Sequence, residues 1–340
     1  MKRVLNIIFL LSFFLYGFSN VVVIDDIKIA VISDVHFLSK RLALPGKALS
    51  AYEKSTGRDI EDLHLVFNFV LNDLLKEEID ILLITGDLSN HGEFQSHIDF
   101  IEKLKPLKDT GVRIFITPGN HDINIPNSKQ YIGDEAISAT SVTAHEFEQL
   151  YNSFGFGNML NKDEASLSYV AEIKDDTWLL SIDANRYDEN INSSVTGGRI
   201  RNTTMLWALQ ILQEAQEKGI RVLGMMHHGL VEHMPFQSTF FSDYLIEDWR
   251  NKADSLADAG LNIVFTGHFH SNDITLHKSP SGNVLYDIET ASLSQYPFAY
   301  RIMNLTDSTL SIDTRFVTST LTHVNLESEY KDKLEALTNK

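Results

Sequence analysis

The chain has 340 residues and no cysteine, which excludes disulfide bonds, thiolate metal ligands and a cysteine nucleophile. Its 46 acidic and 29 basic residues give a formal net charge of −17, and such a surface repels polyanions, so nucleic acid is not expected as a partner. With 43% hydrophobic residues, the chain has enough apolar side chains to bury a large core. Any catalytic metal must be bound by nitrogen and oxygen atoms.

The first residues have the pattern of a secretory signal peptide. A basic start, "MKR", precedes the apolar run "VLNIIFLLSFFLYG" and the small residues of "GFSN". We expect residues 1–19 to be removed by cleavage near Ser19, which gives a secreted or periplasmic protein with no stable membrane span. Cleavage removes Lys2 and Arg3, so the mature charge is 27 − 46, or −19. The alternative is an uncleaved N-terminal membrane anchor.

Beyond this segment, short apolar runs alternate with helical patterns, which predicts an α/β fold. Continuous apolar runs are typical of strands that are buried on both faces, whereas residues 61–78 and 203–219 have apolar side chains at helical spacing. In "NHGE" we expect Asn90 to cap a helix, with Glu93 completing a capping box. The predicted strands are "KIAVIS", "IDILLIT", "VRIFIT", "WLLSID", "IRVLGMM" and "LNIVFT", followed by "NVLYDIET", "YRIMNL" and "LSIDTRFV".

The remaining segments complete the predicted organisation. Residues 37–60, 122–145 and 184–202 read as long loops, and loops of this length in a compact domain are usually functional. "ESEYKDKLEAL" reads as an exposed helix. We therefore divide the chain into the signal peptide, one domain over residues 20–324, and a C-terminal helical tail over residues 325–340.

Five predicted strands end in polar residues of one chemical kind. Open α/β sheets bind ligands at the carboxyl ends of their strands, where loops from several strands converge. A single D-x-H, H-x-H or GD is more often structural, but five such strand ends together predict a site that binds metal ions. The strand ends carry Asp34 and His36; Asp87; Asn120, His121 and Asp122; His227 and His228; and His268 and His270.

The other histidines lie in helical or loop settings and read as ordinary surface or core residues. They are His64, His91, His97, His145, His233, His277 and His323.

In order and spacing, these motifs resemble the calcineurin-like metallophosphoesterase superfamily, whose pattern is D-x-H, GD, GNH[DE], H and GHxH. The resemblance covers residues 28–305 and implies a four-layer α-β-β-α sandwich of two mixed sheets with a dinuclear metal site. It also implies that Asp34, His36 and His270 bind one metal ion, that Asp87 bridges the two ions, and that Asn120, His227 and His268 complete the second site. His121 would face the substrate without binding metal, and Asp122 would orient its ring.

The chemistry of these residues agrees with that assignment. A shared carboxylate lets two divalent ions lie roughly 3.5–4 Å apart, where both contact one phosphate and activate a bridging hydroxide as the nucleophile. His121 would then assist the leaving group as a general acid. Imidazole and carboxylate ligands suit Zn, Mn or Fe, and the sequence does not choose among them.

Three differences between this chain and the patterns of related phosphoesterases bear on which branch of the superfamily it resembles and on its ligands. Purple acid phosphatases have a tyrosine ligand where this chain has Asn90, and protein serine/threonine phosphatases have GDxxDRG and GNHE where this chain has "GDLSNHG" and "GNHD". The chain is more similar to the branch of cyclic-nucleotide and other small-molecule phosphodiesterases. In "HHGLVEHMP" the proline comes late, so either His227 or His228 can be the ligand, and we favour His227 because it comes first after the strand.

We therefore expect an exported, metal-dependent phosphodiesterase that acts on a small-molecule phosphate ester. One alternative is a phosphomonoesterase or nucleotidase with the same site, and another is a non-catalytic surface binding protein on this fold. The aromatic segment 228–249 either lines a pocket or packs in the core, and Arg199 of "SSVTGGR" either approaches a phosphate or belongs to a plain loop.

Overall fold

The computed structural model describes residues 26–320 and 323–338, and most of its strands form two mixed sheets. The first sheet has the order β14-β13-β1-β2-β3 and the second the order β11-β12-β10-β9-β8-β7-β6. The strands of the first are β1 (Ile27–Ile32), β2 (Ile81–Ile84), β3 (Arg113–Ile116), β13 (Ala299–Leu305) and β14 (Leu310–Phe316). Those of the second are β6 (Asn161–Lys162), β7 (Tyr169–Lys174), β8 (Thr177–Ser181), β9 (Arg221–Met225), β10 (Ile263–Thr266), β11 (Asp273–Lys278) and β12 (Val284–Glu289).

Both sheets combine parallel and antiparallel strands, and β3 is a parallel strand at the edge of the first sheet. In the first sheet β1 pairs in parallel with β2 and β2 with β3, while β13 runs antiparallel to both β1 and β14. In the second sheet β8, β9, β10 and β12 are parallel, and β6, β7 and β11 are antiparallel to their neighbours. All nine strands predicted from the sequence are confirmed. Because β1, β2, β3, β9 and β10 run in parallel within their sheets, their carboxyl ends lie at one edge.

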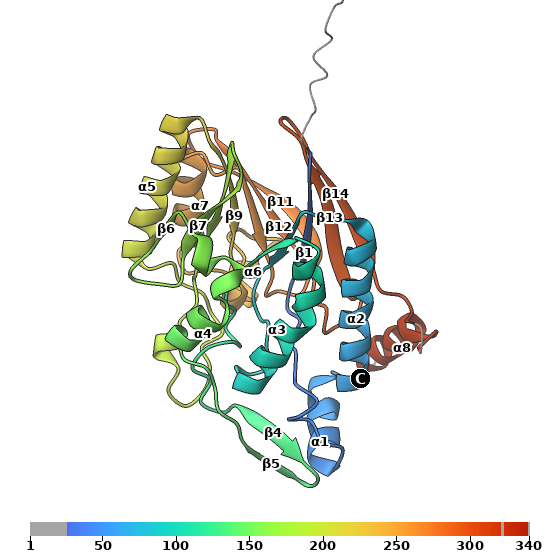
Figure 1. Ribbon diagram of the computed structural model, residues 1–340. Coiled ribbons are helices and arrows are strands. Elements are labelled where there is room, and N and C mark those ends of the chain that lie inside the picture. The colour runs from blue at the N-terminus through green and yellow to red at the C-terminus, as the bar shows by residue number, and fades with distance from the viewer. Residues whose placement is uncertain (1–25, 321–322, 339–340) are drawn as a thin grey trace, which may run out of the picture.

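The two sheets pack face to face and are covered by helices on their outer sides (Figure 1). α2 (Ile60–Glu77) and α3 (Phe94–Asp109) lie against the first sheet, and α5 (Asn202–Lys218) and α7 (Trp249–Asp258) against the second. The smaller helices are α1 (Lys47–Thr56), α4 (Ala144–Leu150), α6 (Gln237–Phe240) and α8 (Leu326–Thr338), with 3-10 turns at Asn152–Phe154, Phe156–Asn158, Tyr187–Glu189 and Ser242–Tyr244. The expected four-layer α-β-β-α sandwich is confirmed.

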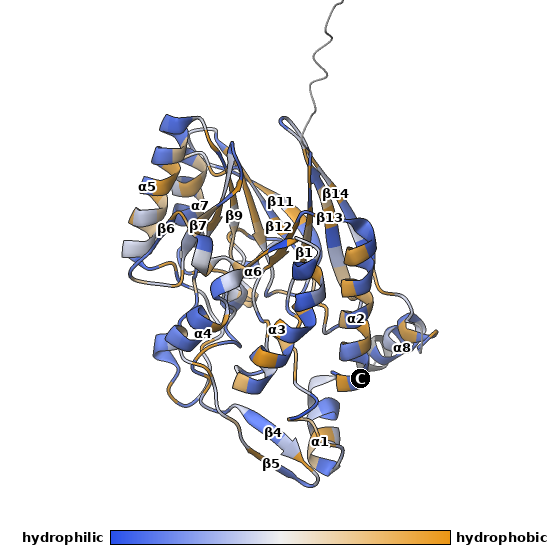
Figure 2. Ribbon diagram, viewed as in Figure 1, coloured by the Kyte–Doolittle hydropathy of each residue, from blue (hydrophilic) through white to orange (hydrophobic). Residues whose placement is uncertain are grey.

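Alternate residues of a central strand belong to different cores. In β8, Leu179 packs in the core between the two sheets, whereas Trp178 and Leu180 pack against the outer helices. The residues are buried on both faces, which is why the sequence of such a strand is apolar throughout instead of alternating. Figure 2 shows hydrophobic residues concentrated in the central strands, with hydrophobic and hydrophilic residues mixed along the helices.

Two of the three expected long loops contain regular structure. Residues 37–60 include α1, and residues 122–145 include a hairpin of β4 (Lys129–Ile132) and β5 (Glu135–Ser138). The expected capping box is wrong, because α3 begins at Phe94 with Glu93 as the preceding residue. Asn90 instead directs its side chain towards Tyr52 and His91. A tertiary contact has therefore replaced the local cap.

The predicted C-terminal helix is present, but it is less exposed than expected. Leu326 and Tyr330 of α8 belong to the main core, and the Tyr330 hydroxyl donates to Asp62 at 3.0 Å. Within residues 26–320 and 323–338, none of the helices combines the length and hydropathy needed to cross a membrane. The predicted signal peptide lies outside the described residues.

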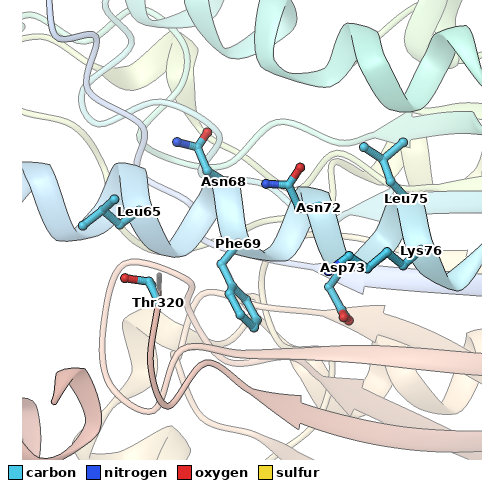
Figure 3. Close-up of a pocket in the computed structure, with 8 residues that line it drawn as sticks. All are labelled: Leu65, Asn68, Phe69, Asn72, Asp73, Leu75, Lys76 and Thr320. Carbon is cyan, nitrogen blue, oxygen red and sulfur yellow. The ribbon is translucent and has the colours of Figure 1, made fainter. Parts of the chain in front are cut away.

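A hollow of about 600 Å³ lies on the outer side of α2, and its chemistry differs from that expected of a catalytic site (Figure 3). Its walls include Leu65, Phe69 and Leu75. Its carboxylate, Asp73, accepts hydrogen bonds from Tyr300 and Arg315 at 2.6 and 2.9 Å. This carboxylate is thus engaged in holding α2 to the first sheet.

Candidate dinuclear metal site

The polar strand ends of both sheets meet at one place. Asp34, His36, Asp87, Asn120 and His121 come from the first sheet, and His227, His268 and His270 come from the second. Backbone hydrogen bonds align the loops: the Asp34 amide donates to Gly86 at 3.1 Å, and the Gly267 amide donates to His227 at 2.9 Å. The structure brings together all seven residues predicted as metal ligands.

The first predicted ligand set forms a compact group. One donor atom from each of Asp34, His36 and His270 lies within 4.8 Å of the other two. The Nε2 atoms of His36 and His270 are 3.3 Å apart, and His270 Nε2 lies 3.2 Å from Asp34 Oδ1. These atoms face a common point, as required of ligands that share an ion.

The second predicted set forms another such group around Asp87. Its carboxylate lies with His227 and His268, again with one donor atom of each within 4.8 Å. His227 Nε2 is 3.5 Å from Asp87 Oδ1 and 3.1 Å from the side-chain oxygen of Asn120. Asp87 Oδ2 is also 3.5 Å from His36 Nε2, so the carboxylate faces both sets, as expected of a bridging ligand.

His121 lies beside both sets, and its ring is held by the backbone. His121 Nδ1 is 3.0 Å from the carbonyl oxygen of Asn90, to which it can donate, and this leaves Nε2 for a substrate. The geometry also allows one nitrogen of His121 to group with His36 and Asp87 within 4.8 Å. Metal analysis of a His121 variant distinguishes a ligand from a general acid.

The loops that present the ligands have an unusual backbone. Asp34, His36, Asp87, His268 and His270 all have positive φ, between 45° and 73°. This region is uncommon for residues other than glycine, and each such residue costs of order 1–3 kcal/mol. Five such residues in one site show that the fold maintains strained turns to aim these side chains back over the strand ends.

The neighbouring glycines are needed because the loops approach one another closely. A Cβ atom on Gly119 would lie 2.1 Å from Asp87 Oδ1, and one on Gly267 would lie 2.6 Å from Asp34 Oδ2. Real Cβ atoms do not approach other atoms so closely. Gly119 and Gly267 therefore allow the two carboxylates to occupy their positions.

Three of the imidazoles are fixed by a hydrogen bond at their second ring nitrogen. His227 Nδ1 lies 2.8 Å from the Thr85 carbonyl oxygen, and His268 Nε2 lies 3.0 Å from that of Asp243. His270 Nδ1 lies 2.9 Å from the side-chain oxygen of Gln295. Partners of this kind set the tautomer and the orientation of a metal-binding imidazole.

The electrostatics of the site favour ionised carboxylates. Burial by itself raises the pKa of Asp34 and Asp87, but the facing imidazoles, chiefly His270 and His227, outweigh it and hold both pKa values below their usual range. Burial lowers the pKa of His36 and lowers that of His268 to about 3. Burial also lowers the pKa of His227, but Asp87 and Asp34 outweigh this effect and raise the pKa of His227 to about 9. The two carboxylates thus favour positive charge at this position, which a bound cation would supply.

The residues present fit two divalent cations. Asp34 Oδ1 is buried without a hydrogen-bond partner among the described residues, although it faces two imidazoles. Leaving a buried carboxylate oxygen unpartnered is costly, and a cation would remove that cost. The donor set contains imidazole nitrogens, carboxylates and an amide oxygen, which suit Zn, Mn or Fe.

His227 and His228 have different surroundings. His227 contacts Asp87 and Asn120, whereas His228 Nε2 lies 2.9 Å from the Thr196 carbonyl oxygen. Burial, reinforced by His268 and His227, holds the pKa of His228 well below its usual range. The structure therefore places His227 in the ligand set and His228 behind it.

The expectation that Asp122 orients the ring of His121 is wrong. Asp122 Oδ1 accepts hydrogen bonds from the amide and hydroxyl of Ser89, both at 2.8 Å, and Oδ2 accepts from the Gly119 amide at 2.8 Å. The partner of the ring is the carbonyl oxygen of Asn90. Asp122 therefore acts on the site indirectly, by joining the turn after β2 to the turn after β3.

Sequence reasoning missed several residues near the site. The ring of His91, read as ordinary, lies 5.0 Å from that of His121, and its place four residues after Asp87 was a usable signal. No sequence pattern indicated Gln295, because its contact with His270 arises only from the tertiary structure. The aromatic segment also reaches the site, since Tyr244 lies 5.1 Å from His268 and 5.0 Å from Phe269, measured between rings.

The fold is similar to those of solved metallophosphatases. A dimetal phosphatase from Danio rerio aligns with a TM-score of 0.56 and 12% identity, over 85% of this chain and 96% of that one. A purple acid phosphatase from yellow lupin (Lupinus luteus) aligns with a TM-score of 0.50 and 12% identity, over 87% of this chain and 52% of that one. At this identity the likeness concerns the fold alone.

Sequence comparison gives a more specific relationship than the similarity of fold does. A probable cyclic nucleotide phosphodiesterase from Coxiella burnetii is 34% identical over 102 residues, which are 30% of this chain and 34% of the relative. The chain thus matches about a third of the length of that relative. The sequence model of the calcineurin-like phosphoesterases matches residues 27–272, which include the five strand ends described above. The chain belongs to the calcineurin-like phosphoesterase family.

Proposed function

We propose that the protein is an exported, dinuclear metal-dependent phosphodiesterase that hydrolyses a small-molecule phosphate ester. The observation that carries the proposal is the convergence of seven ligand-type residues into two sets that both face Asp87. Asp34, His36 and His270 would hold one ion, and Asn120, His227 and His268 the other. When bound, two such ions activate a water as nucleophile and neutralise charge on the phosphoryl oxygens.

The chain's own residues supply the rest of the chemistry. His121 is placed to donate a proton from Nε2 to the leaving oxygen, because the Asn90 carbonyl engages Nδ1. Asp122 keeps the turn that bears His121 in register with the turn that bears Asp87, through its contacts with Ser89 and Gly119. The His121 amide also donates to Asp87 Oδ1 at 2.9 Å, which couples the position of the acid to that of the bridging carboxylate.

The diester preference is supported by two observations. The relative from Coxiella burnetii is named as a probable cyclic nucleotide phosphodiesterase, and the aromatic rings of Tyr244 and Phe269 beside His268 offer an apolar surface for an organic substituent of the phosphate. A phosphomonoesterase or nucleotidase with the same site remains the second candidate. The fold, which is similar to that of a dimetal phosphatase, is compatible with both reactions.

A hydrolysis screen tests the proposal. The metal-loaded protein should hydrolyse bis-p-nitrophenyl phosphate and cyclic nucleotides faster than p-nitrophenyl phosphate. Asp87→Asn should abolish this activity, whereas Asp307→Asn, a matched change at an exposed carboxylate that pairs with Lys174, should preserve it. Faster turnover of the monoester would favour the phosphomonoesterase. Two bound metals without turnover of any ester would favour a binding protein.

A further inference from the structure

A small core separate from the two main ones fixes a segment beside the site. Leu38, Leu49 and Tyr52 pack there with Ile60 and Tyr131. The segment before α1 is also tied to β4, because the Leu44 amide donates to the Tyr131 carbonyl at 2.9 Å. The residues between α1 and α2 are therefore held in place, although the sequence suggested a loop.

Arg58 lies in this segment and extends towards the site. α1 ends at Thr56, Gly57 caps it with a φ of 72°, and Arg58 follows. Arg58 Nη1 is 3.4 Å from the side-chain oxygen of Asn90, and the carbonyl of the same Asn90 holds the ring of His121. Asn90 therefore lies between the Arg58 guanidinium and the ring of the proposed general acid, and it contacts both.

Within the described residues, this guanidinium has no carboxylate partner of its own. Among the residues that the structure describes, no carboxylate forms an ion pair with Arg58, and its half-buried side chain leaves Nε enclosed without an acceptor. Asn90, which Arg58 contacts, also contacts His91 through its side chain and His121 through its carbonyl oxygen. A partly buried guanidinium whose Nε lacks an acceptor is stabilised when an anion joins it.

The contact with Asn90 leaves most of the guanidinium available. A neutral amide at 3.4 Å is a weak partner, the Tyr52 hydroxyl is the other polar neighbour, and Nε is enclosed without a hydrogen-bond partner among the described residues. A guanidinium binds phosphate oxygens through two parallel N–H donors, with a geometry that lysine cannot reproduce. The chain as a whole carries a net charge of −17, so a free cation at this position is not part of a generally basic surface.

We propose that Arg58 is a substrate-binding residue whose guanidinium binds a phosphoryl oxygen of the ester on the side of the site where His121 lies. This inference rests on the proposed function and deepens it. Metal ions held by the predicted ligands would contact the phosphate from one side and Arg58 from the other, so that the leaving oxygen is turned towards His121.

The test uses inorganic phosphate as the probe and the metal-loaded, full-length protein. Arg58→Gln should raise both the inhibition constant of phosphate and the KM of bis-p-nitrophenyl phosphate by about 10- to 100-fold, as expected for a lost hydrogen bond to a charged group. The kcat should change less, and the metal content should equal that of the wild type. Arg58→Lys should recover part of the lost affinity. Lys54→Gln, an exposed cation on α1, is the matched control and should behave as the wild type.

Two results would overturn the inference. One is unchanged phosphate inhibition in Arg58→Gln with both metals bound, and the other is loss of metal from that variant, which would assign Arg58 a structural role. Phosphate binding can be measured by calorimetry without turnover. If the wild type hydrolyses no ester, the proposed function fails, and the difference in phosphate affinity between wild type and Arg58→Gln still decides the role of Arg58.

Discussion

Adding one methyl group at Gly119 should empty the metal site. The Cβ atom of Gly119→Ala would lie 2.1 Å from Asp87 Oδ1 and 2.2 Å from the Asp87 backbone nitrogen. An ordinary contact begins at 3.4 Å, so the carboxylate must retreat by about 3.4 − 2.1, or 1.3 Å. Because the backbone nitrogen is equally close, a side-chain rotation cannot relieve the overlap.

A shift of this size exceeds what metal coordination allows, since ligand distances vary by only about 0.2 Å. Asp87 faces both predicted ligand sets, so both ions should be lost together. The same movement displaces the His121 amide, which donates to Asp87 Oδ1. We expect activity to fall by at least about 100-fold, the upper end of what loss of a supporting residue costs at a metal site. Overpacking should also lower the free energy of unfolding by roughly 1–3 kcal/mol.

Gly111→Ala provides the control for the loss of stability. Gly111 has φ of 96° and open space around its Cα, so alanine there is strained without touching the site. It should cost about 1–2 kcal/mol of stability and leave two metals in place. The assay is elemental analysis of purified protein whose folding has been checked by circular dichroism, followed by ester hydrolysis. Two tightly bound metals and near-normal turnover in Gly119→Ala would refute the bridging position of Asp87.

Three further predictions concern the acid, the buried charges and the N-terminus. His121→Ala should keep both metals but slow the hydrolysis of cyclic nucleotides by about 10²–10⁴-fold. Nitrophenyl esters should be affected less, because only a poor leaving group needs the proton. Equal losses for both substrates, measured by steady-state kinetics, would argue against the role of His121 as general acid. His233 Nε2 lies 3.5 Å from Asp287 and 3.6 Å from Glu289, and these carboxylates, Asp287 foremost, overcome burial and raise the pKa of His233 to about 9. The contribution of His233 to the free energy of unfolding is complete below the unfolded pKa of about 6.5 and is lost as pH rises through 9, by at most about 3 kcal/mol. In urea unfolding, the stability of His233→Gln should therefore depend less on pH than that of the wild type, and parallel curves of stability against pH would contradict this. Finally, intact mass of exported protein should place its first residue near Asn20, whereas full-length protein in the membrane fraction would support the anchor.

The sequence predicted nine strands of the sandwich and the residues that the structure brings together at the candidate site. Strands such as "IDILLIT" are recognisable because they are apolar throughout, which follows from burial on both faces. The ligands were predictable for a related reason: each directly follows such a strand, and carboxyl ends of parallel strands meet at one edge. Asp34, Asp87 and His268 could therefore be placed together although up to 234 residues separate them.

Only the tertiary structure decided how those residues are supported. The ring of His121 is held by the Asn90 carbonyl and not by its neighbour Asp122, and His227 rather than His228 faces Asp87. Asn90 contacts Tyr52 and Arg58, 38 and 32 residues earlier in the chain, in place of capping the helix that follows. Such contacts depend on which way a side chain points after two distant segments have packed. Local sequence sets the type and position of an element, but orientation at the site is set by long-range packing that no short pattern encodes.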